Sequence, residues 1–400
     1  MVEEMRNLLV ISDRYPHQED PYSASFVKKL IKYEKKYFEN VYVISLNPWL
    51  PKFIAKRMSN PRWYKDAIAK NYEYDNVHVY FAKYLTGKGT FFLRKKDSFA
   101  YPLVDKIIRK NDIKFDLIHA HFAHPAGSVA VKIAEKYEKP LVVTAHAHEI
   151  REYPFIDEKL ENKVLWVLQS ADAIITVSQD NVKKMRAFGF KGKVHVIPNG
   201  YDPEVFKPMP KEKIRKELKL PTNKKMIVSV GRLIPRKGYI YLINAVDVLR
   251  KKRDDFFTIV IGDGPLKTDL RNEVKKRGLE KYIKFIGEIP LDEDVARYIA
   301  AADVFVLPTL DEGNPTVMFE SLGCGVPFIG SKVAGIPEII TSEDYGLLTE
   351  PKNTADLAKK LSIALDEEWD KSKILEYAKQ FSWENISKET IELYYSILSS

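Results

Sequence analysis

Two glutamates lie in one stretch of the chain, Asp311 to Gly330, which reads DEGNPTVMFESLGCGVPFIG. Glu312 follows the apolar, strand-like run of residues 304–307, and Gly313 to Pro315 form a turn that opens a helix, because proline fits a first helical turn. Glu320 follows after seven intervening residues, about two turns along that helix. Free N–H groups at a helix start attract an anion such as a diphosphate, and carboxylates accept hydrogen bonds from sugar hydroxyls. The stretch therefore outlines a nucleotide-sugar site.

A second stretch, Gly231 to Gly238 (GRLIPRKG), places cations around a glycine-bounded turn. It lies between a strand-like run and a helical pattern, and its glycines permit close approach of the backbone to a ligand. Arg232 can bind phosphate oxygens through two parallel hydrogen bonds, and Lys237 adds a point charge. We interpret Arg236 as solvent-exposed. A basic surface turn without a ligand is the alternative interpretation.

Five of the eight histidines lie within residues 119–148, namely His119, His121, His124, His146 and His148. Positions i and i+2 of a strand share a face, so His119 with His121, or His146 with His148, could chelate zinc. The chain has neither a helical H-E-x-x-H motif nor a cysteine pair, which disfavours that site. No residue is therefore assigned as a metal ligand.

The turn Gly262 to Pro265 (GDGP) follows the apolar run of residues 258–261 and invites comparison with a dinucleotide-binding turn. It lacks the third glycine of that fingerprint and an acidic residue at the required distance. An oxidoreductase is therefore disfavoured, and we interpret the turn first as scaffold.

Together these motifs resemble the retaining, nucleotide-sugar-dependent glycosyltransferases of the GT-B fold, in the family-4 group. The block around Glu312 and Glu320 is similar to the EX7E signature of that family, and GRLIPRKG is similar to its GRLxxxKG motif. The run TAHAHE, which begins at Thr144, is similar to its T-x-H-x-x-D/E element. Residues 21–26 (PYSASF) depart from the pattern, because they contain no glycine where many members have a pair.

The resemblance implies a donor site made of Arg232, Lys237, Gly262, Glu312, Gly313, Asn314, Pro315, Thr316 and Glu320. In that site Arg232 and Lys237 would bind the diphosphate. Glu312 would bind ring hydroxyls of the sugar, and Glu320 would bind the ribose diol. His146 would point at the donor sugar near the reacting carbon, which makes Glu312, His146, Arg232 and Lys237 the catalytic set. His121 would lie near the acceptor, no metal or other cofactor is expected, and a UDP-sugar is favoured over a GDP-sugar.

Short apolar runs alternate with helical patterns, which predicts parallel, doubly wound sheets. The predicted strands are residues 8–11, 41–44, 77–80, 117–119, 141–144, 173–177, 194–197, 226–230, 257–261, 283–286, 304–307 and 327–330. Residues 45–75 and 81–100 are aromatic and basic, and we expect them to be irregular insertions. The proline-rich run of residues 197–213 is the predicted linker.

The chain is long enough for two domains of roughly 200 residues each. We expect Rossmann-like domains over residues 1–200 and 201–382, with ligands in a cleft between them at the carboxyl ends of the strands. The resemblance implies a GT-B fold in which a terminal helix, about residues 383–400, packs back on the first domain.

Composition excludes several classes of protein. Apolar and charged fractions of 45% and 30% are typical of a soluble globular protein. One cysteine, Cys324, excludes an intramolecular disulfide framework. The N-terminal sequence lacks the apolar core of a signal peptide, and no run reaches the roughly 18 apolar residues of a membrane span. A cytoplasmic location is expected, and richness in Lys, Glu, Ile and Tyr suggests a thermophile.

The positive charge lies in the first half of the chain. Residues 1–200 hold 33 Lys and Arg against 23 Asp and Glu, whereas residues 201–400 hold 31 against 32. In the resembled fold the first domain binds the acceptor, so we expect a lipid-linked or other anionic acceptor and peripheral binding to the inner face of the membrane. The stretches behind this expectation are Trp49, Leu50, Phe53, Ile54, Lys56, Arg57, Trp63 and Tyr64, then Tyr84, Phe91, Phe92, Leu93, Arg94, Lys95 and Lys96. An ordinary basic surface is the alternative, and nucleic acid is disfavoured because no recognition helix or aromatic platform is present.

These patterns predict a retaining glycosyltransferase that moves a sugar from a nucleotide diphosphate sugar to a sugar, a lipid-linked acceptor or a polysaccharide precursor. An inverting enzyme would need a positioned general base, for which His121 and His124 are candidates. Two other classes remain open. One is a sugar-nucleotide-binding protein that does not catalyse transfer, and the other is a GT-B phosphorylase or epimerase.

Overall fold

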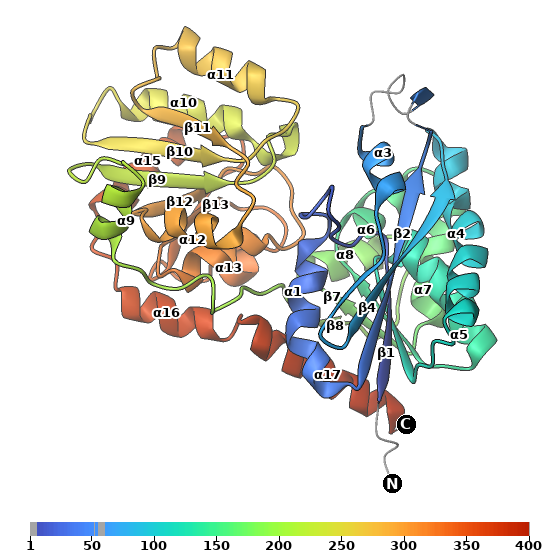
Figure 1. Cartoon of the computed structure of the whole chain (residues 1–400). Helices are drawn as coiled ribbons and strands as arrows, with labels where there is room; N and C mark the ends of the chain where they lie inside the picture. Colours follow the sequence, from blue (N-terminus) through green and yellow to red (C-terminus); the bar gives the residue numbers. More distant parts are fainter. Residues whose placement is uncertain (1–5, 52, 55–60, 400) are drawn as a thin grey trace. The chain divides into compact units, whose positions relative to one another are not determined.

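The computed structural model describes residues 6–51, 53–54 and 61–399, and only the backbone of residues 61–64. The chain divides into two compact units (Figure 1). The first unit extends to Pro198 and takes up the chain again from Ile386, and the second unit extends from Asn199 to Asn385.

The described strands of the first unit form one sheet in the order β3-β4-β2-β1-β5-β6-β7-β8. They are β1 (Asn7–Ser12), β2 (Asn40–Trp49), β3 (Tyr72–Tyr74), β4 (Val77–Leu85), β5 (Leu117–His121), β6 (Leu141–Ala145), β7 (Ala173–Thr176) and β8 (His195–Val196). Neighbouring strands pair in parallel except for the edge strand β3, which is antiparallel to β4. The predicted doubly wound parallel sheet is therefore confirmed, apart from that edge.

Helices cover both faces of this sheet. They are α1 (Ser25–Glu34), α3 (Pro61–Ile68), α4 (Thr90–Lys110), α5 (Ser128–Tyr137), α6 (His148–Arg151), α7 (Glu158–Ser170), α8 (Gln179–Ala187) and α17 (Trp383–Leu398), with the short turns η1 (Lys35–Tyr37), η2 (Ala123–Gly127) and η3 (Tyr153–Phe155). Leu9 and Ile11 of β1 belong to one core with side chains of α4, α5 and α7. Leu8 and Val10, which alternate with them, are also fully buried. Burial on both faces explains why the strands are apolar without interruption.

The second unit repeats this architecture with a sheet in the order β11-β10-β9-β12-β13-β14. Its strands are β9 (Lys225–Val230), β10 (Phe256–Ile261), β11 (Ile283–Gly287), β12 (Val304–Leu307), β13 (Phe328–Ser331) and β14 (Gly346–Thr349). Its helices are α9 (Lys211–Glu217), α10 (Tyr239–Leu249), α11 (Lys267–Lys276), α12 (Asp292–Ala300), α13 (Thr316–Gly323), α14 (Ile336–Ile339), α15 (Thr354–Asp366) and α16 (Lys371–Lys379), with the turn η4 (Pro235–Lys237). Two Rossmann-like units in one chain match the predicted fold class.

Successive residues of β9 pack into two different cores of the second unit, one on each face of the sheet. Met226 and Val228 pack in a core with α12, α13 and α16. Ile227 packs in a second core with α10, α11 and α15. This arrangement holds the loops after β9 and β12 at the same edge of the sheet.

In the described part of the first unit, the expectation of irregular insertions over residues 45–75 and 81–100 is wrong. Residues 45–75 and 81–100 are not irregular, because β2 continues to Trp49, β4 continues to Leu85, and α3, β3 and α4 occupy much of the remainder. The polar residues Ser45 and Asn47 are buried in β2, where the Ser45 hydroxyl donates to Asn47 Oδ1 at 2.7 Å. The short strands β3 and β14 were not predicted.

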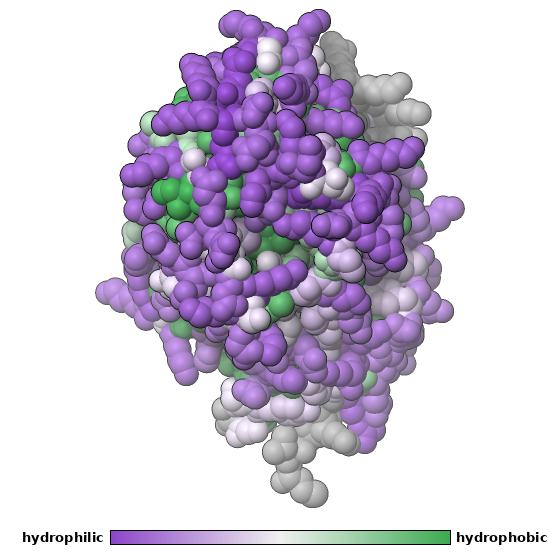
Figure 2. All heavy atoms as spheres, turned by 90° about the vertical axis from the view of Figure 1, so that its left-hand side faces the viewer, coloured by the Kyte–Doolittle hydropathy of each residue, from purple (hydrophilic) through white to green (hydrophobic). Residues whose placement is uncertain are grey.

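Within the described part of the chain, no helix combines the length and the apolar character needed to cross a bilayer. The face drawn in Figure 2 is mostly hydrophilic, with small and separate hydrophobic areas. Of the stretches expected at a membrane, Lys56 and Arg57 lie outside the described residues, as do the side chains of Trp63 and Tyr64. Arg94 is engaged within the unit, because its Nη2 lies 2.9 Å from Asp157 Oδ2.

Candidate donor and acceptor sites

The second unit brings Lys237 and Glu312 together where its strand order reverses. The loop after β9 carries Lys237, the loop after the neighbouring strand β12 carries Glu312, and the chain continues from these strands toward opposite edges of the sheet. Lys237 Nζ lies 2.5 Å from Glu312 Oε1, and the two side chains are only 14% and 8% exposed. Open α/β sheets bind their ligands at such reversal points. Two of the predicted site residues, Lys237 and Glu312, therefore meet where a ligand is expected.

Contacts within the loops hold this ion pair in place. The Thr309 hydroxyl lies 3.2 Å from Glu312 Oε1 and 3.0 Å from the Arg236 carbonyl oxygen. The Leu310 N–H also donates to the Arg236 carbonyl, at 2.8 Å. The two loops are thus hydrogen-bonded to each other beside the pair, which reduces the reorganisation needed to bind a ligand.

Glycines allow the loops of three strands to touch. Gly262, after β10, has φ +138°, and a Cβ there would lie 2.0 Å from the Gly231 carbonyl oxygen. Gly238, before α10, has φ +66°, and a Cβ there would lie 2.0 Å from the Pro308 carbonyl oxygen. Any side chain at either position would force the backbones apart. Gly262 therefore shapes the site through the loop of Gly231, as a scaffold residue would.

The start of α13 offers unpaired donors next to Glu312. Pro315 is the N-cap, and no side chain caps the helix. Among the described residues, the backbone N–H groups of Gly313, Asn314, Thr316 and Val317 have no hydrogen-bond acceptor. Asn314 is fixed by Asn199, whose N–H donates to Asn314 Oδ1 at 2.9 Å and whose Nδ2 donates to the Asn314 carbonyl at 2.6 Å. Unpaired N–H groups and the helix dipole make this a site for an anion.

Arg232 and Glu320 differ in their exposure to solvent. Arg232 is exposed, as is Arg236. Glu320, within α13, is 5% exposed. Burial, and to a smaller extent the charge of Glu320, raises the pKa of the Cys324 thiol. Cys324 therefore stays protonated and is a structural residue.

In the first unit, β5 and β6 bring His121 and His146 together. His121 Nδ1 lies 3.1 Å from His146 Nε2, and the rings stack with an interplanar angle of 17°. Burial lowers the pKa of His121 to about 3 and the pKa of His146 well below its usual value, so both rings are neutral at pH 7. His121 Nε2 and His146 Nδ1 are buried without a hydrogen-bond partner. One imidazole donates to the other, so the free nitrogens present one N–H and one lone pair.

His119 belongs to a different contact network. Its Nε2 lies 2.6 Å from Thr144 Oγ1, and its Nδ1 lies 2.6 Å from the hydroxyl of Tyr394 in α17. The Tyr394 hydroxyl also donates to Glu34 of α1, at 3.4 Å. Both ring nitrogens are engaged, so His119 has no free lone pair for zinc. His119 is therefore a structural histidine that connects β5 to α17 and α1.

His124 and His148 are also engaged. His124 contacts Ser128 Oγ at 2.9 Å and the Leu93 carbonyl at 2.7 Å, which leaves no nitrogen to serve as a general base. His148 Nδ1 lies 2.7 Å from Glu152 Oε1 at the surface. In the residues that the structure describes, no three His, Cys, Asp or Glu side chains gather as metal ligands would.

Sequence reasoning missed the polar residues that follow β1. Asp13 Oδ1 accepts the N–H of Ala126 at 2.8 Å, which joins the loop after β1 to the loop after β5. Burial raises the pKa of Asp13 to about 7. The signal was present in the sequence, because Asp13 and Arg14 directly follow the first apolar run, LLVIS. Polar residues at the carboxyl end of a central parallel strand are typical of ligand sites.

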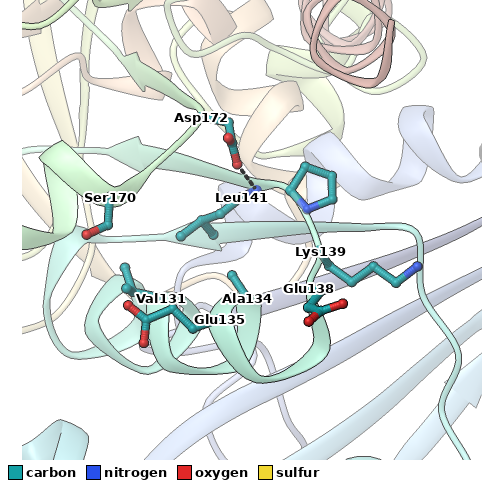
Figure 3. A pocket seen from close by; sticks show the side chains of 9 residues that line it. Val131, Ala134, Glu135, Glu138, Lys139, Leu141, Ser170 and Asp172 are labelled. Atoms are coloured by element: carbon teal, nitrogen blue, oxygen red, sulfur yellow. Dashed lines mark hydrogen bonds between the residues drawn. The ribbon is translucent and has the colours of Figure 1, made fainter. Parts of the chain in front are cut away.

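A cavity of about 480 Å³ at the start of β6 is unrelated to these groups. Figure 3 shows it between β6 and α5, with Asp172 accepting the Leu141 N–H and with Glu135, Glu138 and Lys139 along it. That hydrogen bond measures 2.7 Å and satisfies the buried end of the strand. This cavity lies at the amino ends of the strands, whereas ligands of such sheets bind at the carboxyl ends.

Comparisons with known proteins agree with this geometry. The family model described as "Glycosyl transferases group 1" matches residues 210–381, and the model described as "Glycosyltransferase Family 4" matches residues 85–205. TuaC of Bacillus subtilis, a glycosyltransferase assigned to teichuronic acid biosynthesis, is 30% identical over 361 residues, which cover 89% of this chain and 88% of TuaC. The D-inositol 3-phosphate glycosyltransferase of Corynebacterium glutamicum is 27% identical over 72% of this chain and 73% of its own.

A solved structure shows the same fold. HepE of Anabaena, in complex with UDP-glucose, superposes with a TM-score of 0.71 over 98% of this chain and 100% of that chain, at 22% sequence identity. Two Rossmann-like units of this kind form the GT-B fold. The chain belongs to the GT-B glycosyltransferase superfamily. The predicted fold class and general activity are confirmed, whereas the cleft between the domains stays a prediction.

Proposed function

We propose that this protein transfers a sugar from a nucleoside diphosphate sugar to an acceptor with retention of anomeric configuration. The observation that carries the proposal is the Lys237–Glu312 ion pair beside the unpaired N–H groups at the start of α13. HepE was solved with UDP-glucose, which supports a UDP-sugar over a GDP-sugar as the donor. The name of the Corynebacterium relative, D-inositol 3-phosphate glycosyltransferase, supports an anionic acceptor.

The leaving diphosphate gains negative charge as the bond to the sugar breaks. Arg232, Lys237 and the N–H groups of Gly313, Asn314 and Thr316 would stabilise that charge without an added metal ion. Glu312 holds Lys237 and would accept hydrogen bonds from ring hydroxyls of the sugar. Glu320 would bind the ribose diol. The leaving phosphate would take the proton of the acceptor hydroxyl, so no separate base is required.

His146 and His121 complete the proposed roles. His146 is assigned to the sugar near the reacting carbon, and His121 is assigned to the acceptor. Their free nitrogens, His146 Nδ1 and His121 Nε2, are the atoms available for those contacts. Both rings are neutral at pH 7, so each would act as a hydrogen-bonding group.

A turnover experiment with isotopically labelled UDP-sugars tests the proposal. The purified protein is incubated with a UDP-sugar and candidate acceptors, and the anomeric coupling of the product is measured by NMR. We expect release of UDP and a product with the donor's anomeric configuration. An inverted coupling rejects retention, and UDP binding without turnover of any donor indicates a sugar-nucleotide-binding protein. The absorbance spectrum of the protein separates a pyridoxal-phosphate-dependent phosphorylase from both.

A further inference from the structure

A second cavity, of about 230 Å³, lies within the first unit at the carboxyl ends of its strands. Its polar lining includes Asp13, Arg14, Tyr84, Lys96, Glu149 and Tyr153, together with His124 and His148, whose contacts are given above. Asp13 and Arg14 follow β1, which lies between β2 and β5, where the strand order of this sheet reverses. The cavity therefore occupies the position in the first unit that the Lys237–Glu312 pair occupies in the second.

Two cations of this cavity lack partners. Neither Arg14 nor Lys96 forms an ion pair with a described residue, and Arg14 Nη1 is buried without a hydrogen-bond acceptor. Burial lowers the pKa of the Lys96 ammonium, and the neighbouring charge of Arg14 lowers it further, against the opposite effect of Asp13. Arg14 and Lys96 are both partly buried, and cations withdrawn from water without partners destabilise a fold unless a bound anion compensates them.

The carboxylates at the cavity compensate these two cations only in part. Asp13 Oδ1 accepts the Ala126 N–H at 2.8 Å, and burial raises the pKa of Asp13 to about 7, so part of the population is neutral at pH 7. The carboxylate of Glu149 is directed to the backbone, where it accepts the N–H groups of His146 at 2.6 Å and Ala147 at 3.3 Å. Neither carboxylate forms an ion pair with Arg14 or Lys96, so both cations keep hydrogen-bonding capacity for a bound anion.

We propose that this cavity binds an anionic group of the acceptor, a phosphate or a carboxylate, through Arg14 and Lys96. The hydroxyls of Tyr84 and Tyr153, which form no hydrogen bond with described residues, are available to neighbouring hydroxyls of the same molecule. The volume is below the roughly 300–1,000 Å³ of sites for drug-sized ligands, so it suits a headgroup of sugar-phosphate size. The identification of the ligand as the acceptor rests on the proposed function, whereas the binding of an anion does not.

The experiment is calorimetric titration of UDP-saturated protein with inorganic phosphate, glucuronate and glucose. Saturation with UDP fills the diphosphate site, so that added phosphate reports on the cavity. We expect Arg14→Gln and Lys96→Gln to weaken the binding of phosphate or glucuronate roughly 10- to 100-fold, the effect of losing one charge-assisted hydrogen bond. Lys96→Arg, which keeps the charge, restores most of the affinity. Lys95→Gln removes an exposed cation from the same helical turn and is expected to change nothing.

A second arm identifies the source of the anion. It compares sn-glycerol 3-phosphate with phosphatidylcholine vesicles that contain phosphatidic acid. A loss of vesicle binding in Lys96→Gln but not in Lys106→Gln, which removes an exposed cation elsewhere on α4, assigns the cavity to a lipid headgroup. A loss confined to sn-glycerol 3-phosphate assigns it to a soluble acceptor. The proposal is overturned if no anionic probe saturates the UDP-loaded wild type, or if both cavity variants bind these probes like the wild type. If UDP does not bind but phosphate binding still depends on Arg14 and Lys96, the anion site stands and the proposed function falls.

Discussion

At the scale of single residues, charge supplied by side chains is expected to replace a metal ion at the diphosphate. Arg232 is exposed at the mouth of the site and free to bind, whereas Lys237 is preset by Glu312. The two cations would therefore act differently, Arg232 as a flexible clamp and Lys237 as a fixed charge. Glu312 is held by Lys237, so the pair should be regarded as one unit.

We predict that Arg232→Ala and Lys237→Ala each weaken UDP binding. A charge-assisted hydrogen bond contributes about 1.5–3 kcal/mol, which corresponds to roughly 10- to 100-fold in affinity. Arg236→Ala, in the same turn, is the matched control and should bind UDP like the wild type. Calorimetry measures the affinities, and melting curves show whether the fold is kept. Equal affinities in all four proteins would refute the assignment of Arg232 and Lys237.

We also predict full turnover in the presence of excess chelator. The cations of the second unit and the N–H groups at the start of α13 supply the positive charge that a divalent ion would otherwise supply. The assay compares initial rates before and after dialysis against chelator. A loss of activity that added metal restores would contradict the prediction and call for ligands beyond those described here.

At the scale of secondary-structure elements, α17 is tied to the first unit by a buried polar network. Tyr394 contacts both His119 of β5 and Glu34 of α1. Burial raises the pKa of Glu34 to about 8, although the hydrogen bond from Tyr394 opposes this shift. Helix α17 is therefore held by a buried polar network, and burial of that network is tolerated only while Glu34 stays protonated.

This network predicts a pH-dependent stability. Between the ordinary glutamate pKa of 4.5 and about 8, the unfolded chain loses the Glu34 proton while the folded chain keeps it. The free energy of unfolding of the wild type should fall in that window relative to Glu34→Gln, with each unit of pKa difference worth about 1.4 kcal/mol. Urea unfolding at pH 5 and pH 8 measures the difference. Glu39→Gln, an exposed site, is the control, and a gap between Glu34→Gln and wild type that is the same at both pH values would disprove the account.

At the scale of the whole molecule, the excess of positive charge lies in the chain that builds most of the first unit. Phe53, Leu85 and Phe91 of that unit are 75%, 57% and 62% exposed. Arg94 is committed to Asp157, and Lys96 lines the cavity, so Lys95 is the exposed cation of that run. Fewer cations are therefore available for membrane attachment than the sequence suggested.

We still predict salt-sensitive binding to anionic vesicles. Apolar side chains would enter the headgroup region while basic residues each add about 1 kcal/mol near an anionic surface. Phe53→Ser combined with Phe91→Ser should reduce co-sedimentation with anionic vesicles at low salt. Phe155→Ser, which removes a ring of 58% exposure elsewhere in the unit, should not. Failure of the wild type to sediment with either anionic or neutral vesicles would leave a soluble acceptor as the substrate.

The sequence alone determined the order in which strands and helices follow one another along the chain, and it determined the residues of the donor loops. Buried parallel strands are recognisable in a sequence as apolar runs. Glycine, proline and charged residues at the ends of such runs mark binding loops within a few positions. The loops of Lys237 and Glu312 could therefore be predicted from the residues near them in the sequence. Only the tertiary structure decided which histidines are free, because hydrogen bonds with Thr144 and Tyr394 occupy both nitrogens of His119, and the hydrogen bond between His121 and His146 leaves one nitrogen free on each ring. Only the tertiary structure placed Arg14 beside Lys96, since residues on different elements meet through packing of α4 against the sheet, and no local pattern encodes that contact.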